Sequence, residues 1–177
     1  MKKSILSIAI FAITLLATSE TAAQKFKALD KSPMDVASFP SSYKVSDKVV
    51  KVVYSRPQLK GRKVSKLAPA GKVWRTGANE AVEITFYRDV TFGGKAVKAG
   101  TYSLFTIPSE AGDWTVIINS ARNVWGSYFY KQDQDVVRVS GTVSRSEKSI
   151  EAFSILIDSD MTLKMGWGNT VVSVPIK

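Results

Sequence analysis

The sequence contains neither cysteine nor histidine. Without cysteine there is no disulfide, so the stability of the fold must come from its core alone. Without histidine, a Ser-His-Asp or Cys-His catalytic system is excluded, and the commonest protein ligand of zinc and copper is missing. Any catalysis would depend on carboxylates, lysine, tyrosine, serine or a hard cation bound by carboxylates. We expect no metal site and no cofactor.

Long hydrophobic runs are also scarce, and the single one is at the N-terminus. Lys2 and Lys3 precede an apolar stretch over residues 4–16, which is too short to span a bilayer comfortably. Small residues at 21–23 follow, which predicts a signal peptide over residues 1–23 and a mature chain that begins at Gln24. We therefore expect an exported protein, in the periplasm or outside the cell, and not an integral membrane protein once the signal peptide is removed.

The chain is basic, with a formal net charge of +10. A basic surface favours acidic partners such as anionic glycans, although solubility alone is a sufficient reason for the charge. Lysine and arginine are spread along the chain and form no block of the kind that marks a nucleic-acid-binding arm. We expect no nucleic-acid partner and make no prediction of the oligomeric state.

Short alternating strands separated by turn signals fill the region from residue 49 to the C-terminus. In the segment 82–87, Val82, Ile84 and Phe86 share one face. About ten such strands, with little helix, predict an all-β fold, an antiparallel β-sandwich or jelly roll formed by a single domain over 49–177. Residues 24–48 contain two prolines and predict an extended lead-in with at most one short strand or turn of helix.

Local patterns predict further elements. Gly93-Gly94 is a hairpin signal between two short strands. A short edge strand is predicted over 64–67, and the only helical piece is expected near 121–130. Separate strands are predicted at 136–143 and 150–158, and Gly168-Asn169 is interpreted as a hairpin turn into the last strand.

The segment 71–81, GKVWRTGANEA, holds the densest cluster of residue types that a plain strand does not need. Gly77 permits a sharp turn, which would place Arg75 and Glu80 on either side of it. In a structural interpretation, Arg75 and Glu80 form a buried or half-buried ion pair and Trp74 belongs to the core. In a functional interpretation, Trp74 is a stacking platform, and Arg75, Asn79 and Glu80 face a ligand.

A basic cluster and an aromatic patch add candidates. Arg56 and Arg62 suit a carboxylate, sulfate or phosphate, unless they lie in a solvated loop or pair with nearby glutamates. Trp125 begins an aromatic patch that continues over 128–130, which would stack on sugar rings, form a protein interface or cover the end of a sandwich. The predicted ligand-binding residues are Arg56, Arg62, Trp74, Arg75, Asn79, Glu80 and Trp125.

Acidic residues give weaker signals. The segments 133–135 and 158–160 could offer oxygen ligands to calcium, but neither has EF-hand spacing and both are more simply turns. Glycoside hydrolysis needs two carboxylates at a defined separation. Glu80 with Glu83 or Asp135 would provide them only if the fold brought the pair together.

Several motifs together resemble the signature of a known family. They are YSRP at 54–57, KGR at 60–62 and GKVWRTGANEA at 71–81, and the similarity continues to VPI at 174–176. On these residues the chain resembles the bacterial exported family called domain of unknown function 2911, over nearly all of its length from about Val49. One departure is Ser65-Lys66, where the family usually has phenylalanine and glycine. The resemblance implies a β-rich domain that carries a signal peptide, and it implies no activity.

We therefore expect a non-catalytic module of the bacterial periplasm or cell exterior that binds an anionic or carbohydrate ligand. Two alternatives stay open. One is a carboxylate-dependent hydrolase or lyase with Glu80 as general acid or base. The other is a structural or envelope-assembly protein in which the 71–81 segment only stabilises the fold.

Overall fold

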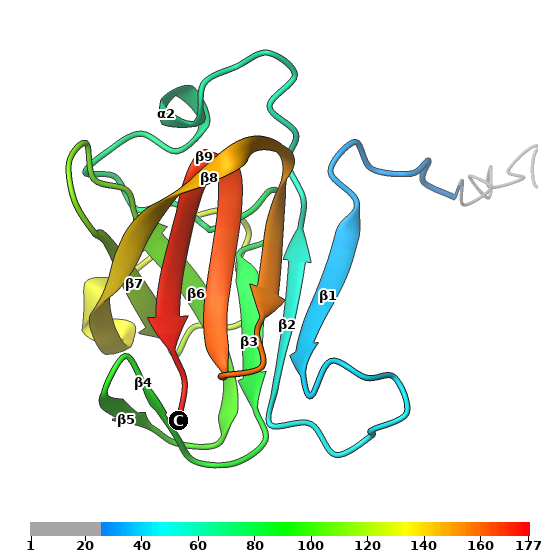
Figure 1. Ribbon diagram of the computed structural model, residues 1–177, viewed down its shortest axis with the longest axis vertical. Coiled ribbons are helices and arrows are strands. Elements are labelled where there is room, and N and C mark those ends of the chain that lie inside the picture. The colour runs from blue at the N-terminus through cyan, green and yellow to red at the C-terminus, as the bar shows by residue number, and fades with distance from the viewer. Residues whose placement is uncertain (1–25) are drawn as a thin grey trace, which may run out of the picture.

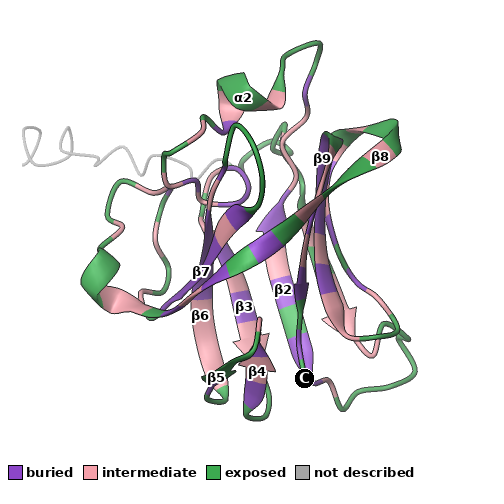
Figure 2. Ribbon diagram, turned by 60° about the vertical axis from the view of Figure 1, so that its left-hand side comes forward, coloured by how far each residue is buried: buried purple, intermediate pink, exposed green. Residues whose placement is uncertain are grey.

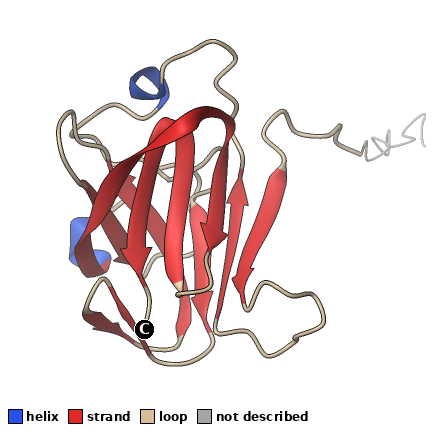
Figure 3. Cartoon of the chain, in the orientation of Figure 1, coloured by secondary structure: helices blue, strands red, loops and turns tan. Residues whose placement is uncertain are grey.

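The computed structural model describes residues 26–177 (Figure 1), so the predicted signal peptide and its cleavage position before Gln24 lie outside the described residues. The prediction of an all-β fold is confirmed (Figure 3). The strands are β1 (Met34–Phe39), β2 (Val50–Ser55), β3 (Val82–Phe86), β4 (Val90–Phe92), β5 (Lys95–Val97), β6 (Gly100–Ile107), β7 (Trp114–Asn119), β8 (Asp135–Ile157) and β9 (Thr162–Pro175). The helical pieces are one turn of α-helix, α2 (Val64–Leu67), and one 3-10 turn, η1 (Gln132–Gln134).

Seven strands form one antiparallel sheet in the order β1-β2-β3-β6-β7-β8-β9, and β4 and β5 form a separate hairpin. The long strand β8 folds this sheet over itself. Its first residues pair with β7 as far as Gly141 opposite Trp114, and its next residue, Thr142, already pairs with Ser173 of β9. Figure 1 shows β8 arching over the top of the molecule from one layer to the other. The result is a two-layer, sandwich-like fold.

The core lies between the two layers and follows from the period of two along each strand. Figure 2 shows buried residues along β2, β3 and β9, and exposed residues on α2 and on the crossing part of β8. Aromatic rings fill one end of the core. Trp74 stacks on Trp167 with ring centroids 5.3 Å apart, and Phe153 and Trp114 pack edge-on against Trp74. These rings bury more apolar area per residue than any aliphatic side chain could.

The two layers are also joined along the side where β2 meets the second half of β8. Past the end of β2 the backbone continues the contact, because Phe153 N–H donates to Pro57 C=O at 2.9 Å and Leu59 N–H donates to Glu151 C=O at 3.0 Å. The Arg56 side chain also spans this junction and donates to Phe153 C=O at 3.1 Å.

Three local predictions are wrong. The segment 64–67 is a helical turn and not an edge strand, because Ala68 N–H bonds back to Val64 C=O and Lys66 N–H to Lys63 C=O. The Gly168-Asn169 pair lies inside β9, so no hairpin occurs there; Gly168 (φ 58°) marks an irregularity opposite Ile150. The segment 121–130 is a loop and not a helix.

The strands predicted at 136–143 and 150–158 are one continuous strand, β8. The lead-in over residues 24–48 contributes β1, which pairs with β2 along its full length. The structure thus has nine strands in the part of the chain it describes, and two of them are long. Within residues 26–177, no helix has the length and apolar character needed to span a membrane.

Candidate functional site

Residues 75–81 form a loop, which we call the excursion, that leaves the sheet and returns to it beside the same strand, β6. Trp74 exchanges backbone hydrogen bonds with Thr106 of β6 at 2.7 and 2.9 Å, and Val82 pairs with Leu104 two residues further along the same strand. Val82 N–H donates to Arg75 C=O at 3.1 Å and closes the base of the excursion. Trp74 and Val82 thus keep their core positions, while the residues between them leave the sheet.

The excursion has a strained backbone. Thr76 (φ 61°) and Asn79 (φ 62°) adopt left-handed conformations; asparagine tolerates this conformation, but it is unusual for a β-branched residue such as Thr76. Thr76 is fully buried, and its Oγ1 lies 3.2 Å from Thr106 Oγ1. A Cβ on Gly77 would lie 3.0 Å from the Ser55 carbonyl oxygen, so the turn packs directly on β2. Strain of this kind costs of order 1–3 kcal/mol per residue and is concentrated at functional sites in proteins.

A second loop, residues 120–131, lies against the excursion and is closed by Asn119 at the end of β7. The fully buried Asn119 amide donates to Lys131 C=O at 3.0 Å and to Asp135 Oδ1 at 2.8 Å, and it accepts from Ala121 N–H at 3.0 Å. The Tyr130 hydroxyl donates to the other Asp135 oxygen at 2.7 Å. One buried amide therefore holds both ends of the loop.

The excursion and the loop are joined by a short backbone pairing, which we call the loop bridge (residues 79–81 and 124–126). Ala81 N–H donates to Val124 C=O at 3.0 Å, and Gly126 N–H donates to Asn79 C=O at 2.9 Å. Glu80 and Trp125 are opposite each other in this pairing. Gly126 (φ 65°) allows close approach, because a Cβ there would lie 2.8 Å from the Tyr128 ring.

Arg75 is the exceptional residue of the site. The ion pairs of the described residues are Arg56–Asp35, Lys98–Asp89, Arg138–Asp135 and Lys164–Asp158, and none includes Arg75. Its Nε is the one buried side-chain nitrogen or oxygen without a hydrogen-bond partner in residues 26–177. Burial lowers the pKa of the guanidinium, and nearby Tyr128 acts in the opposite direction. The predicted ion pair between Arg75 and Glu80 is absent.

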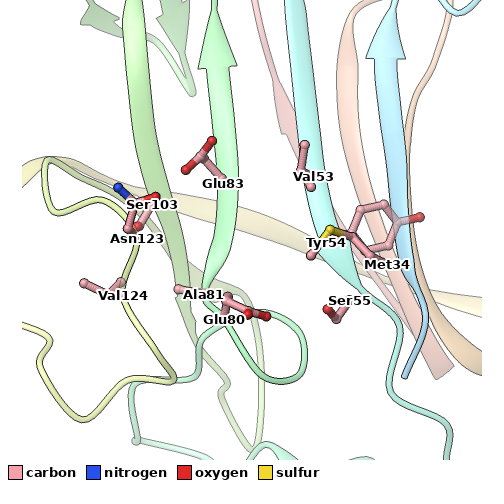
Figure 4. Close-up of a pocket in the computed structure, with 10 residues that line it drawn as sticks. All are labelled: Met34, Val53, Tyr54, Ser55, Glu80, Ala81, Glu83, Ser103, Asn123 and Val124. Carbon is pink, nitrogen blue, oxygen red and sulfur yellow. The ribbon is translucent and has the colours of Figure 1, made fainter. Parts of the chain in front are cut away.

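Glu80 and Glu83 reach a pocket on the outer face of the sheet, shown in Figure 4. The pocket has a volume of about 140 Å³ and is lined by residues of β1, β2, β3 and β6 and of both loops. Among the described residues no group of three or more acidic side chains is placed to hold a metal ion. Asp135 is not part of this pocket, because it is engaged with Asn119 and Tyr130.

The comparisons with known proteins give one match. The family model described as protein of unknown function (DUF2911) matches residues 32–176. The chain belongs to this family. Neither the comparison with curated proteins nor that with solved structures found a match. The family match begins just before β1, so the DUF2911 domain includes this edge strand of the sheet.

Three of the predicted ligand residues of this DUF2911 domain have structural partners instead. Trp74 is in the core with 6% of its surface exposed, as the structural interpretation has it. The three nitrogens of Arg56 donate to Phe153 C=O, Asp35 Oδ2 and Ser154 Oγ. Arg62 donates to the carbonyls of Leu59 and Gln58 and closes the turn before it.

The remaining four, Arg75, Asn79, Glu80 and Trp125, lie on the excursion and the loop bridge, but Glu80 reaches the pocket of Figure 4 and Arg75 lies beside Tyr128. Asn79 lies beside Asp30, whose pKa is lowered by the Ser32 backbone N–H and then by the Asn79 amide. Trp125, Tyr128 and Phe129 are 54%, 81% and 68% exposed, so this aromatic patch is at the surface.

Sequence reasoning missed Asn119 and Ser55. Asn119 closes the 120–131 loop, and the only signal for it was an amide residue at the end of an apolar strand. Ser55 is 4% exposed and lines the pocket of Figure 4. The sequence could not predict that Ser55 lines this pocket, because its surroundings depend on the packing of Gly77 against β2.

Proposed function

We propose that this DUF2911 protein is a non-catalytic binding module whose ligand carries an anionic group held by Arg75. The observation that carries the proposal is the Nε of Arg75, which is buried without a hydrogen-bond partner. A buried donor without a partner costs about 1–3 kcal/mol, and a planar guanidinium is the group best suited to bind carboxylate, sulfate or phosphate in a bidentate manner. An anion would offset the cost that the free protein carries at Arg75.

The surroundings of Arg75 support a ligand that is a sugar or has another flat face. Tyr128 lies close to the guanidinium, and Trp125 and Phe129 are exposed on the same loop. Exposed aromatic rings with a polar edge stack on sugar rings and planar groups. An acidic saccharide, with its anionic group on Arg75 and a ring on Tyr128 or Trp125, combines both features.

The backbone of the site favours binding over a purely structural role. Thr76 holds a strained conformation next to Arg75, and the loop bridge fixes the relative position of the two loops. This strain costs free energy in the free protein and gives the Arg75 guanidinium no partner. It does pre-organise the guanidinium, which reduces the ordering cost when a ligand binds.

We also propose that the protein acts after export, in the periplasm or outside the cell. The support for this is the N-terminal pattern of two lysines, an apolar stretch and small residues before Gln24. Cell fractionation followed by N-terminal sequencing tests it, and we expect the exported fraction to begin at Gln24. A cytoplasmic protein that keeps Met1 or Lys2 would contradict it.

A matched set of sugars tests the binding proposal. Thermal unfolding is measured with glucuronate, glucose 6-phosphate and glucose 6-sulfate, and with glucose as the uncharged control. An anionic sugar at about 100 times its dissociation constant adds about 2.7 kcal/mol, which raises the melting temperature of a domain of this size by about 5–10 °C. We expect at least one anionic sugar to do so and glucose to have no effect, and Arg75→Met to abolish the rise. If all four sugars have equal effects, or none, the proposal is wrong.

A further inference from the structure

The tip of the loop over residues 120–131 is a tight turn whose two central residues are aromatic. Tyr130 N–H donates to Ser127 C=O at 3.3 Å and closes the turn, so Tyr128 and Phe129 occupy its centre. They are 81% and 68% exposed. Turn centres usually hold Gly, Pro, Asn, Asp or Ser, because these residues suit both the turn backbone and water. Two adjacent exposed rings at such a tip, soon after the exposed Trp125, indicate an interaction surface.

The backbone holds this aromatic patch (Trp125, Tyr128 and Phe129) in its exposed position. After the turn, the Tyr130 ring packs edge-on against Phe105, with 5.1 Å between the centroids, and its hydroxyl is tied to Asp135. Before the turn, Gly126 is tied to the excursion through the loop bridge. The other strongly exposed aromatic residues in the described part of the chain lie in separate segments: Phe26, Tyr43 and Tyr87. The patch is therefore a fixed feature of an anchored loop.

The loop that carries the patch is also cationic. The sequence from residue 114 to residue 132 contains no aspartate or glutamate, and Arg122 and Lys131 are exposed near the two ends of the loop. Neither cation belongs to an ion pair of residues 26–177. Glu80, which is opposite Trp125 in the loop bridge, reaches the pocket of Figure 4. Figure 1 shows the yellow 3-10 turn η1, which directly follows the loop, on the side of the molecule away from β1.

We infer that this loop docks on the surface of an anionic lipid bilayer. The aromatic patch enters the headgroup region, where amphipathic aromatic rings are favoured, while Arg122 and Lys131 stay at the level of the lipid phosphates. The net charge of +10 adds a long-range attraction to such a surface. A protein partner fits less well, because a stable interface takes about 800 Å² from each side, which is more than the exposed parts of three rings provide.

Tryptophan fluorescence tests the inference, because Trp125 is the exposed tryptophan of the chain. Trp74, Trp114 and Trp167 are 6%, 8% and 3% exposed, so their emission is already that of a dry environment. A shift of the emission to shorter wavelength during titration with vesicles therefore reports the transfer of Trp125 out of water. We expect a saturable shift with vesicles of phosphatidylglycerol and phosphatidylcholine in equal amounts. Binding should be at least about tenfold weaker with phosphatidylcholine alone, and added salt should weaken the binding to anionic vesicles.

Variants locate the contact on the loop. Phe129→Ser should weaken binding to anionic vesicles by about tenfold or more, because it removes an apolar ring that the bilayer covers. Lys131→Gln should weaken it about fivefold. Tyr43→Ser is the matched control, since Tyr43 is 90% exposed in the connection between β1 and β2, and its loss should leave binding unchanged. All three side chains are exposed, so the variants should keep the fold.

The inference goes beyond the anion proposal and does not rest on it. Arg75→Met should abolish the response to anionic sugars and leave vesicle binding unchanged, so the two proposals can fail separately. The inference is overturned if anionic vesicles cause no saturable shift, if Phe129→Ser binds them as tightly as wild type, or if Tyr43→Ser weakens binding equally. It is also overturned if the shift occurs without vesicles as the protein concentration rises, which would assign the patch to a contact between two copies of the chain.

Discussion

The hydroxyl of Tyr54 makes two hydrogen bonds to the backbone of a single residue, Ile155. It accepts from Ile155 N–H at 3.0 Å and donates to Ile155 C=O at 3.2 Å. Tyr54 is in β2 and Ile155 in the second half of β8, so this side chain adds a link between the two layers at a point where the two strands do not pair. Burial is the first cause of a raised pKa for this tyrosine, which therefore stays protonated and able to donate.

Tyr54→Phe should reduce the free energy of unfolding by about 2–3 kcal/mol. The substitution leaves the N–H and C=O of Ile155 buried without partners, and each such group costs about 1–3 kcal/mol. Urea denaturation measures the change. Tyr102→Phe is the matched control, because the Tyr102 hydroxyl donates to Lys98 C=O at the surface, and it should cost less than about 1 kcal/mol. Equal losses in both variants would mean that the Tyr54 hydroxyl does not join the layers.

Asn119→Ala should destabilise the protein by about 3 kcal/mol and open the loop over residues 120–131. It removes three hydrogen bonds of a fully buried amide and leaves Ala121, Lys131 and Asp135 without them. Hydrogen exchange should accelerate in this loop more than in β6 or β9. Asn169→Ala removes a single exposed hydrogen bond to Ser146 and should change stability by less than about 1 kcal/mol. Unchanged exchange in the loop would show that Asn119 does not close it.

The raised pKa of Tyr130 leads us to expect a loss of stability at alkaline pH. Burial, and then the hydrogen bond to Asp135, raise its pKa from 10.0 to about 12. The folded state therefore holds the phenolic proton more tightly than the unfolded chain does. Its contribution is complete below pH 10 and is lost as the pH rises from 10 to 12. The difference in unfolding free energy between wild type and Tyr130→Phe should shrink over this window. Tyr128→Phe, which removes an exposed hydroxyl, should show no such trend.

Gly141→Ala should destabilise the fold by about 1–3 kcal/mol, the usual cost of overpacking a core. A Cβ at this position would lie 2.6 Å from both Val116 and Val172, at the point where β8 leaves one layer for the other. Adding Val116→Ala should recover part of the loss, since it removes one of the two clashing side chains. If the double variant loses the full sum of the two single changes, the close approach is not the cause.

The strands could be predicted because their core faces alternate, as in β3, and because Gly93-Gly94 encodes a tight hairpin. The continuity of β8 could not, since its middle, around residues 144–148, is polar on both faces like a loop. Ser144 and Arg145 pair with β9, and the pairing is irregular from there to Ile150, so the segment is held at its two ends while it crosses between the layers. No local sequence pattern indicates that a strand crosses from one layer to the other.

The candidate site was predicted in part. Chain proximity suggested that Arg75 and Glu80 would pair, but the backbone prevents it: the strained turn at 76–79 carries Glu80 to the pocket beside β3, whereas Arg75 stays beside Tyr128. The sequence also could not show that Arg56 would be hydrogen-bonded to Asp35 and β8, because these partners are far from Arg56 along the chain.

The central claim is that Arg75 serves a ligand and not the fold, and parallel urea denaturation of Arg75→Met and Arg56→Met tests it most directly. Arg75→Met keeps the apolar stem and removes an unsatisfied buried donor, so the free energy of unfolding should stay the same or rise by up to about 1–2 kcal/mol. Arg56→Met breaks an ion pair and two further hydrogen bonds and should lose about 2 kcal/mol. A loss of several kcal/mol in Arg75→Met, equal to or larger than that in Arg56→Met, would contradict the account and make Arg75 a structural residue.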